Sequence, residues 1–168
     1  PFAGHPTIGS ARAWLAAGHH ADMAWLPRTA DKRANPQRVL PGARTKILLG
    51  VNYLPEGRAG TQQRWAKYAL WSDYHDTIAN GLQAAGAVLE RECGLRREDY
   101  RVYVDAGPVL ERGWAAQAGM GWRGKNAMLI SREYANWLFL AAIVARAEIP
   151  ADDPLAIEPV ERRGVHGG

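Results

Sequence analysis

The sequence predicts an α+β fold, a single mixed domain with a central sheet flanked by helices. Residues 45–54 form a continuous apolar run bounded by Pro and Gly, which is typical of a buried strand. Apolar residues recur every three or four positions over residues 65–93, which is typical of one face of a long helix. A second, shorter strand pattern at residues 101–105 follows that helix, so both types of element alternate in one chain.

Length and composition favour one domain with a core of its own. The chain has 168 residues, of which 47% are hydrophobic, and single domains commonly contain about 100 to 150 residues. We expect residues 1–10 to be an N-terminal extension, residues 11–150 to be the domain, and residues 151–168 to be a linker or tail rich in Pro, Asp, Arg and Gly. The chain begins at Pro1 without a Met, so we expect a fragment.

The other elements follow from local patterns in chain order. Prolines break the polar segment 29–44 into a loop, and Pro108 favours the first turn of a helix. The segment 136–149 is mostly apolar, and its pattern leaves helix and strand open. We expect short helices at residues 11–20 and 21–28, a helix at residues 109–118 and a strand at residues 127–130.

The charge balance is compatible with an anionic partner. Lys and Arg number 21 against 17 Asp and Glu, and the net charge is +4. Basic residues gather at positions 28–46 and again at positions 112–132. A solvated basic face explains this pattern as well as a nucleic-acid contact does.

Cysteine and histidine usage restricts the metal chemistry of the chain. Cys93 is its single cysteine, so the chain alone builds neither a disulfide framework nor a four-cysteine zinc or iron–sulfur site. His19, His20 and His75 lack the spacing of the histidine pairs of zinc enzymes, so we assign no metal ligand and expect hydrogen-bonding or surface roles. No apolar run reaches the ~18 residues of a membrane span and no secretory signal is present, so we expect a cytoplasmic monomer.

A glycine-rich turn fits two phosphate-binding patterns but lies in the wrong context for both. Gly119, Gly121 and Gly124 give G-x-G-x-x-G, and Gly119 to Lys125 give G-x-x-x-x-G-K. Both patterns need a strand before the glycines and a helix after them. Here a helix pattern precedes the turn and a strand pattern follows it, which disfavours an NTPase or a nicotinamide dehydrogenase.

Several short motifs, in this order and spacing, resemble the epoxyqueuosine reductase family over residues 10–160. The motifs are those at residues 17–26, 31–36, 40–43, 52–53, 68–69 and 73–75, and the block VDAGPVLERGWAAQAGMGWRGKN at residues 104–126. The resemblance implies a cobalamin-dependent enzyme that reduces epoxyqueuosine to queuosine in the anticodon loop of a tRNA. It also implies a flavin-reductase-like, cobalamin-binding core and a C-terminal part with two [4Fe–4S] clusters.

This chain corresponds to the N-terminal part of that family. Where the family continues into cysteine motifs, the chain reads Glu161-Arg-Arg-Gly-Val-His-Gly-Gly168, so it cannot bind the clusters itself. We therefore expect the chain to bind cobalamin and a tRNA anticodon stem-loop without turning over alone. The electron donor is not identified by the sequence.

Asp105 is the proton donor that the resemblance implies. Breaking a carbon–oxygen bond leaves charge on oxygen, and a carboxylic acid kept neutral by burial beside an apolar ligand can protonate that oxygen. From the residues alone, an equally simple role is open. Asp105 ends a strand, and its side chain could instead bond the backbone of the turn at residues 106–108.

The resemblance also implies cofactor contacts at Arg33, Tyr68, Lys125 and Asn126, together with Asp105. The glycines of the turn at residues 119–126 suit close approach of the backbone to a large ligand. Structural alternatives remain open for several residues. Tyr68 fits a core position on the long helix, Glu111 and Arg112 fit an ion pair or packing role, and Trp122 and Trp137 fit the core.

Two other functions stay open at this point. A basic chain is compatible with a non-catalytic tRNA-binding fragment, whose affinity would fall steeply with salt. Residues 1–11 resemble a Gly-His-Pro-Thr segment of the phenazine-biosynthesis-like isomerase family, which leaves an isomerase fragment as a further alternative.

Overall fold

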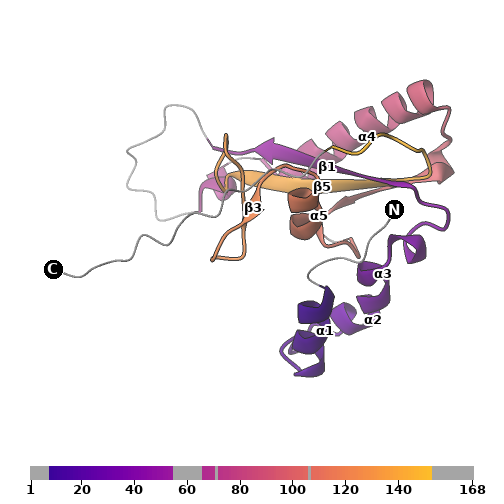
Figure 1. The fold of residues 1–168 in the computed structure, drawn as a ribbon. Coiled ribbons are helices and arrows are strands. Elements are labelled where there is room, and N and C mark those ends of the chain that lie inside the picture. The colour runs from indigo at the N-terminus through magenta and orange to yellow at the C-terminus, as the bar shows by residue number, and fades with distance from the viewer. Residues whose placement is uncertain (1–7, 55–65, 71, 106, 153–168) are drawn as a thin grey trace.

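The computed structural model describes residues 8–54, 66–70, 72–105 and 107–152 (Figure 1). Most of the predicted extension, the isomerase-like segment, and nearly all of the predicted tail lie outside these residues. The elements in order are α1 (Ile8–Ala16), α2 (Trp25–Arg28), α3 (Ala30–Ala34), η1 (Pro36–Arg38), β1 (Thr45–Asn52), η2 (Lys67–Leu70), α4 (Tyr74–Cys93), η3 (Arg97–Asp99), β2 (Tyr100–Val104), α5 (Glu111–Gln117), β3 (Trp122–Arg123), β4 (Leu129–Ile130) and β5 (Leu138–Ala145).

The main sheet has three antiparallel-paired strands in the order β1-β5-β2. In the register, Asn52 lies opposite Leu138 and Val104 lies opposite Ala141. Because β1 and β2 both run antiparallel to β5, they end at the same end of the sheet, where β5 begins. We call this the site end, and we call the opposite end, where β1 and β2 start, the ion-pair end.

β5 is buried on both faces, which explains its continuous apolar sequence. Its side chains alternate between faces, as strand geometry requires. Ala141, Ile143 and Ala145 pack on the α4 face, against Ile78, Leu82 and Leu89. Ala142 and Val144 pack on the α5 face, against Leu40, Val109 and Trp114. The predicted sheet flanked by helices is confirmed, and the undecided segment at 136–149 proves to contain the central strand.

α4 is shorter at its start than its apolar pattern predicts. The helix begins at Tyr74 rather than near residue 65, because the Asp73 carboxylate accepts a hydrogen bond from the His75 backbone N–H (2.8 Å) and caps it. Lys67–Leu70 form a separate 3₁₀ turn, and Trp65 lies outside the described residues. α4 ends at Gly94, which adopts the left-handed conformation (φ 64°).

α5 also begins later than predicted. It starts at Glu111, so Pro108 precedes the helix instead of occupying its first turn. Val109 is fully buried in the core on the α5 face. Burial of this side chain requires the chain to run across the core before it turns into the helix, which a one-dimensional pattern does not reveal.

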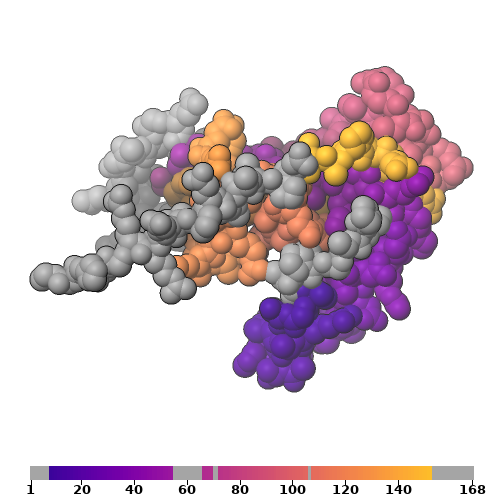
Figure 2. All heavy atoms as spheres, in the orientation of Figure 1, coloured from indigo at the N-terminus to yellow at the C-terminus, as the bar shows by residue number. Residues whose placement is uncertain are grey.

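Two further expectations need correction. The predicted loop at 29–44 contains α3 and η1, and the Asn35 side chain caps η1 by accepting from Gln37 N–H (3.0 Å). β1 is an edge strand of half-buried and exposed residues rather than a buried strand. Figure 1 shows α1 to α3 set apart from the sheet, and the indigo to purple atoms of this region form a lobe at the bottom of Figure 2.

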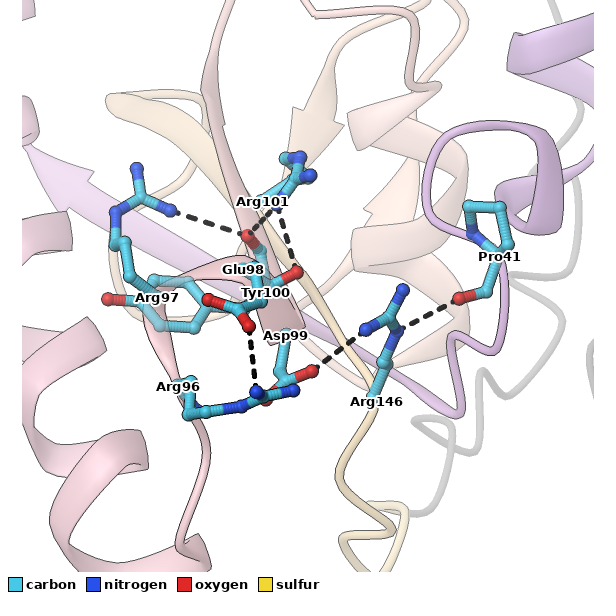
Figure 3. Close-up of polar contacts among 8 residues, drawn as sticks. All are labelled: Pro41, Arg96, Arg97, Glu98, Asp99, Tyr100, Arg101 and Arg146. Carbon is cyan, nitrogen blue, oxygen red and sulfur yellow. Dashed lines mark hydrogen bonds and ion pairs between the residues drawn. The ribbon is translucent and has the colours of Figure 1, made fainter.

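The ion-pair end is closed by a polar network (Figure 3). The Arg146 guanidinium donates to Asp99 Oδ1 (2.8 Å) and to the Pro41 carbonyl (3.0 Å). Its backbone N–H also donates to the Asp99 carbonyl (3.0 Å). These bonds join the end of β5 to the start of β2 and to the segment before β1.

The short β3–β4 hairpin follows α5 and precedes β5. The predicted strand at 127–130 is present only as Leu129–Ile130. A Cβ at Gly121 would overlap the backbone of Ile130. The close approach that this glycine permits is therefore to the partner strand of the hairpin, not to a ligand.

Candidate active site

Asp105 follows β2 directly and lies at the site end. Its φ is 50°, in the left-handed region that Asp tolerates better than most residues. The side chain is 55% exposed. No element in the described part of the chain covers the end of β2, so the protein alone does not bury this carboxyl group; the expected burial beside an apolar ligand stays a prediction.

The Tyr74 hydroxyl donates a hydrogen bond to Asp105 Oδ2. Tyr74 is the first residue of α4, and its ring stacks on Phe139 of β5 at 3.9 Å with an interplanar angle of 6°. Burial, followed by the hydrogen bond and the charge of Asp105, raises the pKa of Tyr74 to about 12. The phenol thus stays protonated and remains a donor to the carboxylate.

His75 lies between two carboxyl groups. Its Nδ1 is 2.8 Å from Asp73 Oδ1, and its Nε2 is 3.5 Å from Asp105 Oδ2. The backbone N–H of His75, followed by its side chain, holds the pKa of Asp73 below its ordinary value. An imidazole in this position can hold a proton or exchange one with a neighbouring acid. The predicted hydrogen-bonding role of His75 is confirmed, and its partners lie at the candidate site.

Aromatic rings line the α4 face of the sheet next to Asp105. We call this set the aromatic wall; it consists of Tyr53, Tyr68, Tyr74, Trp137 and Phe139. Tyr53 stacks on Phe139 with ring centroids 4.4 Å apart, and Tyr68 meets Phe139 edge to face at 6.4 Å. The wall presents flat, partly exposed rings beside a carboxyl group.

Tyr68, Trp122 and Trp137 lie outside the hydrophobic core. Tyr68 is 50% exposed and lies on η2 rather than on the long helix, so the alternative of a core position is wrong, and its role as a cofactor contact stays a prediction. Trp122 and Trp137 are partly buried and belong to neither core cluster. Trp137 contacts Tyr53 edge to face, and the Lys67 ammonium lies 4.8 Å from the Trp137 ring centroid.

No ion pair joins Glu111 to Arg112 within the described residues, and the contact of Arg112 fits the alternative packing role. The Arg112 guanidinium donates to the Ala127 carbonyl (2.8 Å) and so ties α5 to the hairpin. Glu111 Oε1 is buried and has no hydrogen-bond partner within the described residues. Burial raises the pKa of Glu111 to about 7; its own backbone N–H and Arg33 oppose this effect, and the Asp105 charge adds to it.

Arg33 joins the N-terminal helices to the segment before α5. Its Nη1 donates to the Val109 carbonyl (3.0 Å), its Nε donates to Thr29 Oγ1 (3.2 Å), and its guanidinium lies 5.2 Å from the Trp25 ring centroid. Burial lowers the pKa of Arg33, and Glu111 opposes that shift. The described contacts of Arg33 are within the protein.

Lys125 and Asn126 occupy the exposed turn of the β3–β4 hairpin. Asn126 Oδ1 accepts from the Met128 backbone N–H (3.1 Å), which stabilises the turn. The hairpin belongs to the α5 face, where Met120 lies against Gly50. No contact within the described part of the chain joins Lys125 or Asn126 to Asp105.

A pocket of 440 Å³ lies on the α5 face of β1, away from Asp105. Its lining includes Lys46, Trp114 and Asp152. The Lys46 ammonium lies 4.7 Å from the Trp114 ring centroid, and burial lowers the pKa of Lys46. Neither Asp105 nor its partners Tyr74 and His75 line this pocket, so the pocket and the candidate site are separate.

The described contacts of Asp105 are made with α4. Its described partners are Tyr74 and His75, both from the start of α4, rather than the backbone at residues 107–108. Sequence analysis missed both partners of Asp105. The signal was present in the motif Asp73-Tyr-His75, because an Asp that caps a helix places the next two side chains at its first turn.

The described ranges contain neither a candidate membrane span nor a candidate metal site. No helix there combines the length and apolar character needed to cross a membrane. No group of three or more His, Cys, Asp or Glu side chains in the same ranges is arranged to hold a metal ion.

The chain is similar in sequence to epoxyqueuosine reductases. Residues 33–106 match the family model described as epoxyqueuosine reductase QueG, DUF1730. The epoxyqueuosine reductase of Synechocystis sp. is 41% identical over 146 residues, which cover 85% of this chain and 49% of the relative. That of Vibrio cholerae is 37% identical over 150 residues, which cover 85% of this chain and 40% of the relative. The chain thus spans half or less of the length of these relatives.

Solved structures share the fold. An epoxyqueuosine reductase from Streptococcus thermophilus aligns with a TM-score of 0.70 at 24% identity, covering 94% of this chain and 43% of that one. An epoxyqueuosine reductase crystallised with an epoxyqueuosine-modified tRNA-Tyr stem loop aligns with a TM-score of 0.63 at 25% identity, covering 75% of this chain and 35% of that one. The family resemblance that the motifs indicated is confirmed.

Proposed function

Because the chain is related to the epoxyqueuosine reductases, we propose that it forms the N-terminal, cobalamin-binding part of an enzyme that reduces epoxyqueuosine to queuosine in tRNA. The observation that carries this proposal is the contact between Asp105 and Tyr74 beside the aromatic wall. It places a carboxyl group, a permanent hydrogen-bond donor and an apolar surface together at one end of the sheet.

Exposed apolar side chains at the site end support the proposal of a large, flat cofactor. Val51, Leu54 and Tyr68 expose apolar surface there, and the rings of Tyr53 and Phe139 lie behind Tyr68. An apolar wall with a few polar groups is the usual lining of a cofactor site. Cobalamin, when bound, would supply the reducing centre. Lys125 and Asn126 are exposed on the hairpin of the α5 face, so a bond of either residue to the amide or phosphate groups of the cofactor stays a prediction from the family resemblance.

The chemical step requires protons as well as electrons. Removing the epoxide oxygen as water consumes two electrons and two protons. We assign the first proton transfer to the Asp105 carboxyl group, which gives its proton to the oxygen as the carbon–oxygen bond breaks. Tyr74 then stabilises the resulting carboxylate through its hydroxyl, and His75 is placed to return a proton to it.

The electrons are proposed to come from [4Fe–4S] clusters that another part of the protein, or a partner, supplies. Cys93 is the single cysteine of this sequence, so the chain does not itself contain the ligands of such clusters. A flavin-reductase-like origin of the core, a monomeric state and a cytoplasmic location also stay predictions.

The tRNA substrate is proposed from one structural relative and from the charge of the chain. That relative was crystallised with an epoxyqueuosine-modified stem loop, and this chain carries a net charge of +4. Binding of an anticodon stem-loop should weaken as salt rises, because phosphate contacts release counterions. Binding that is absent at low salt would contradict the tRNA part of the proposal alone.

Mixing the purified chain with cob(II)alamin and recording the visible spectrum tests the cofactor part. Binding is expected to change the spectrum in proportion to protein added. Tyr68→Ala should weaken the change, since it removes an exposed ring from the aromatic wall. Val88→Ala is the matched control, because Val88 is an exposed apolar residue on the remote part of α4. A spectrum that is unchanged at high protein concentration would contradict cobalamin binding.

A further inference from the structure

The first three helices of the described chain have no buried core of their own. None of α1, α2 and α3 contains a buried residue. Large apolar side chains are nevertheless present, and Trp14, Met23 and Trp25 are exposed, Trp25 to 47%. We call residues 8–38, from α1 to η1, the N-terminal lobe; it forms the protrusion at the bottom of Figure 2. Exposed apolar side chains that recur within one small lobe indicate a surface that binds a partner.

The charge of the N-terminal lobe selects the class of partner. The lobe contains five Lys and Arg residues against two Asp residues, so its net charge is +3, while that of the whole chain is +4. Arg12, Arg28 and Lys32 are exposed. Such an excess of positive charge attracts a polyanion, and the counterions that phosphates release add to the affinity. A nucleic acid fits this charge, whereas the lobe of a second copy would carry the same sign and be repelled.

The Trp25 ring is held in place while much of it stays exposed. The Arg33 guanidinium lies over the ring, 5.2 Å from its centroid. Arg33 is itself fixed, because its Nε donates to Thr29 Oγ1 (3.2 Å) and its Nη1 donates to the Val109 carbonyl (3.0 Å). Proteins that bind single-stranded nucleic acid stack unpaired bases on exposed rings beside cations. Since the bases of a duplex are already stacked, the ring and the charges together favour an RNA loop.

We propose that the N-terminal lobe binds the unpaired bases of an RNA loop, with Trp25 stacking on a base and Arg28 and Lys32 contacting phosphates. The inference rests on the proposed function, whose substrate is a tRNA anticodon stem-loop. The Arg33 bond to the Val109 carbonyl attaches the lobe to the segment that leads from Asp105 to α5. An RNA loop on the lobe is therefore held by a part of the protein that is bonded to the chain next to the proposed proton donor.

Binding of a fluorescently labelled tRNA anticodon stem-loop to the 168-residue chain, measured by anisotropy without cobalamin, tests the inference. Trp25→Leu keeps an apolar side chain but removes the aromatic face, and it should weaken binding roughly 5- to 150-fold, the value of one base stack. Trp25→Phe keeps a ring and should retain most of the affinity. Lys32→Gln should reduce the slope of log affinity against log salt concentration by about 1.

Two substitutions outside the lobe are the matched controls. Tyr134→Leu removes an exposed ring, and Arg91→Gln removes an exposed cation that pairs with Glu92 at the end of α4. Both should keep the affinity of the unmodified chain. Ultraviolet cross-links between the RNA and the protein, located by mass spectrometry, should fall within residues 8–38; a merely structural role of Trp25 does not predict this.

Equal affinities of Trp25→Leu, Trp25→Phe and the unmodified chain would overturn the inference, and so would cross-links confined to residues outside the lobe. A dimer that Trp25→Leu dissociates in analytical ultracentrifugation would overturn it too, because the surface would then belong to a second copy. RNA that binds elsewhere on the chain would refute the lobe surface but leave the proposed function intact. An unchanged cobalamin spectrum would contradict the cofactor part of the proposed function and leave this RNA measurement unaffected, so the two failures are distinguishable.

Discussion

Asp99 and Asp105 flank the same strand, β2, yet their exposure and their bonding partners differ at the two ends of the sheet. Asp99 is 13% exposed and contacts two arginines, Arg146 (2.8 Å) and Arg96 (3.4 Å). The backbone N–H of Arg96, followed by the Arg146 side chain, lowers the pKa of Asp99. Asp105 is 55% exposed, and its contacts are a phenol and an imidazole.

The difference in partners separates a carboxylate that stabilises the fold from one that is proposed to transfer a proton. Arginine partners hold a carboxylate in its charged form, because the guanidinium stays charged and donates in a fixed geometry. Asp99 is therefore unable to act as an acid near neutral pH. No arginine contacts Asp105 among the described residues, and its partners there are a phenol and an imidazole rather than a guanidinium.

The same substitution at both ends of β2 should give opposite results. In a polypeptide extended with the C-terminal half of a curated relative, Asp105→Asn should lower queuosine formation by about 10²- to 10⁴-fold, the usual value of a general acid. Cobalamin binding and the free energy of unfolding should be unchanged. Asp99→Asn should instead lower the unfolding free energy while the folded fraction keeps its activity. Full activity of Asp105→Asn would refute the proton-donor role.

The buried acid near the site end should make stability depend on pH. The pKa of Glu111 rises from 4.5 to about 7 on folding, so the folded state binds more protons between these values. The unfolding free energy should then fall as pH rises through this window, by on the order of 3 kcal/mol. Glu111→Gln should remove this slope in urea unfolding measured across the range. An unaltered slope would show that Glu111 is not the group responsible.

Crowding the ion-pair end should destabilise the fold without touching the site end. A Cβ at Gly86 would lie 2.5 Å from the buried Tyr100 hydroxyl. Gly86→Ala should therefore cost about 1–3 kcal/mol by overpacking. Gly81→Ala on the same helix is the control, since nothing lies within 4 Å of its Cβ, and it should stabilise by up to ~1 kcal/mol. Equal effects in denaturant unfolding would contradict this packing.

The smallest effect is expected from one hydrogen bond at the ion-pair end. The Tyr100 hydroxyl donates to Glu90 Oε1 (2.8 Å). Tyr100→Phe keeps the ring in the core and should lower the unfolding free energy by about 0.5–1.5 kcal/mol. Tyr134→Phe should have a smaller effect, because the Tyr134 hydroxyl bonds to Glu133 at the exposed surface. A larger loss for Tyr134→Phe than for Tyr100→Phe in thermal unfolding would contradict the assigned importance of this end.

Sequence patterns predicted an element well where neighbouring residues in the chain determine its conformation. The strand at residues 45–52 and the end of β2 just before Asp105 follow from short-range apolar patterns and turn residues. The patterns gave the wrong position or role where a contact between residues distant in the sequence determines the local structure. Val109 enters the core instead of starting α5, and the glycine at position 121 meets its partner strand instead of a ligand.

The sequence by itself determined the family, the mixed α and β composition and the candidate acid Asp105, because motif order and residue type are properties of the chain alone. The tertiary structure decided which side chains surround that acid. Tyr74 lies 31 positions away in sequence from Asp105 and reaches it because α4 packs on the sheet. Contacts at such separation depend on how the helix and the strands pack together, and no local pattern encodes that arrangement.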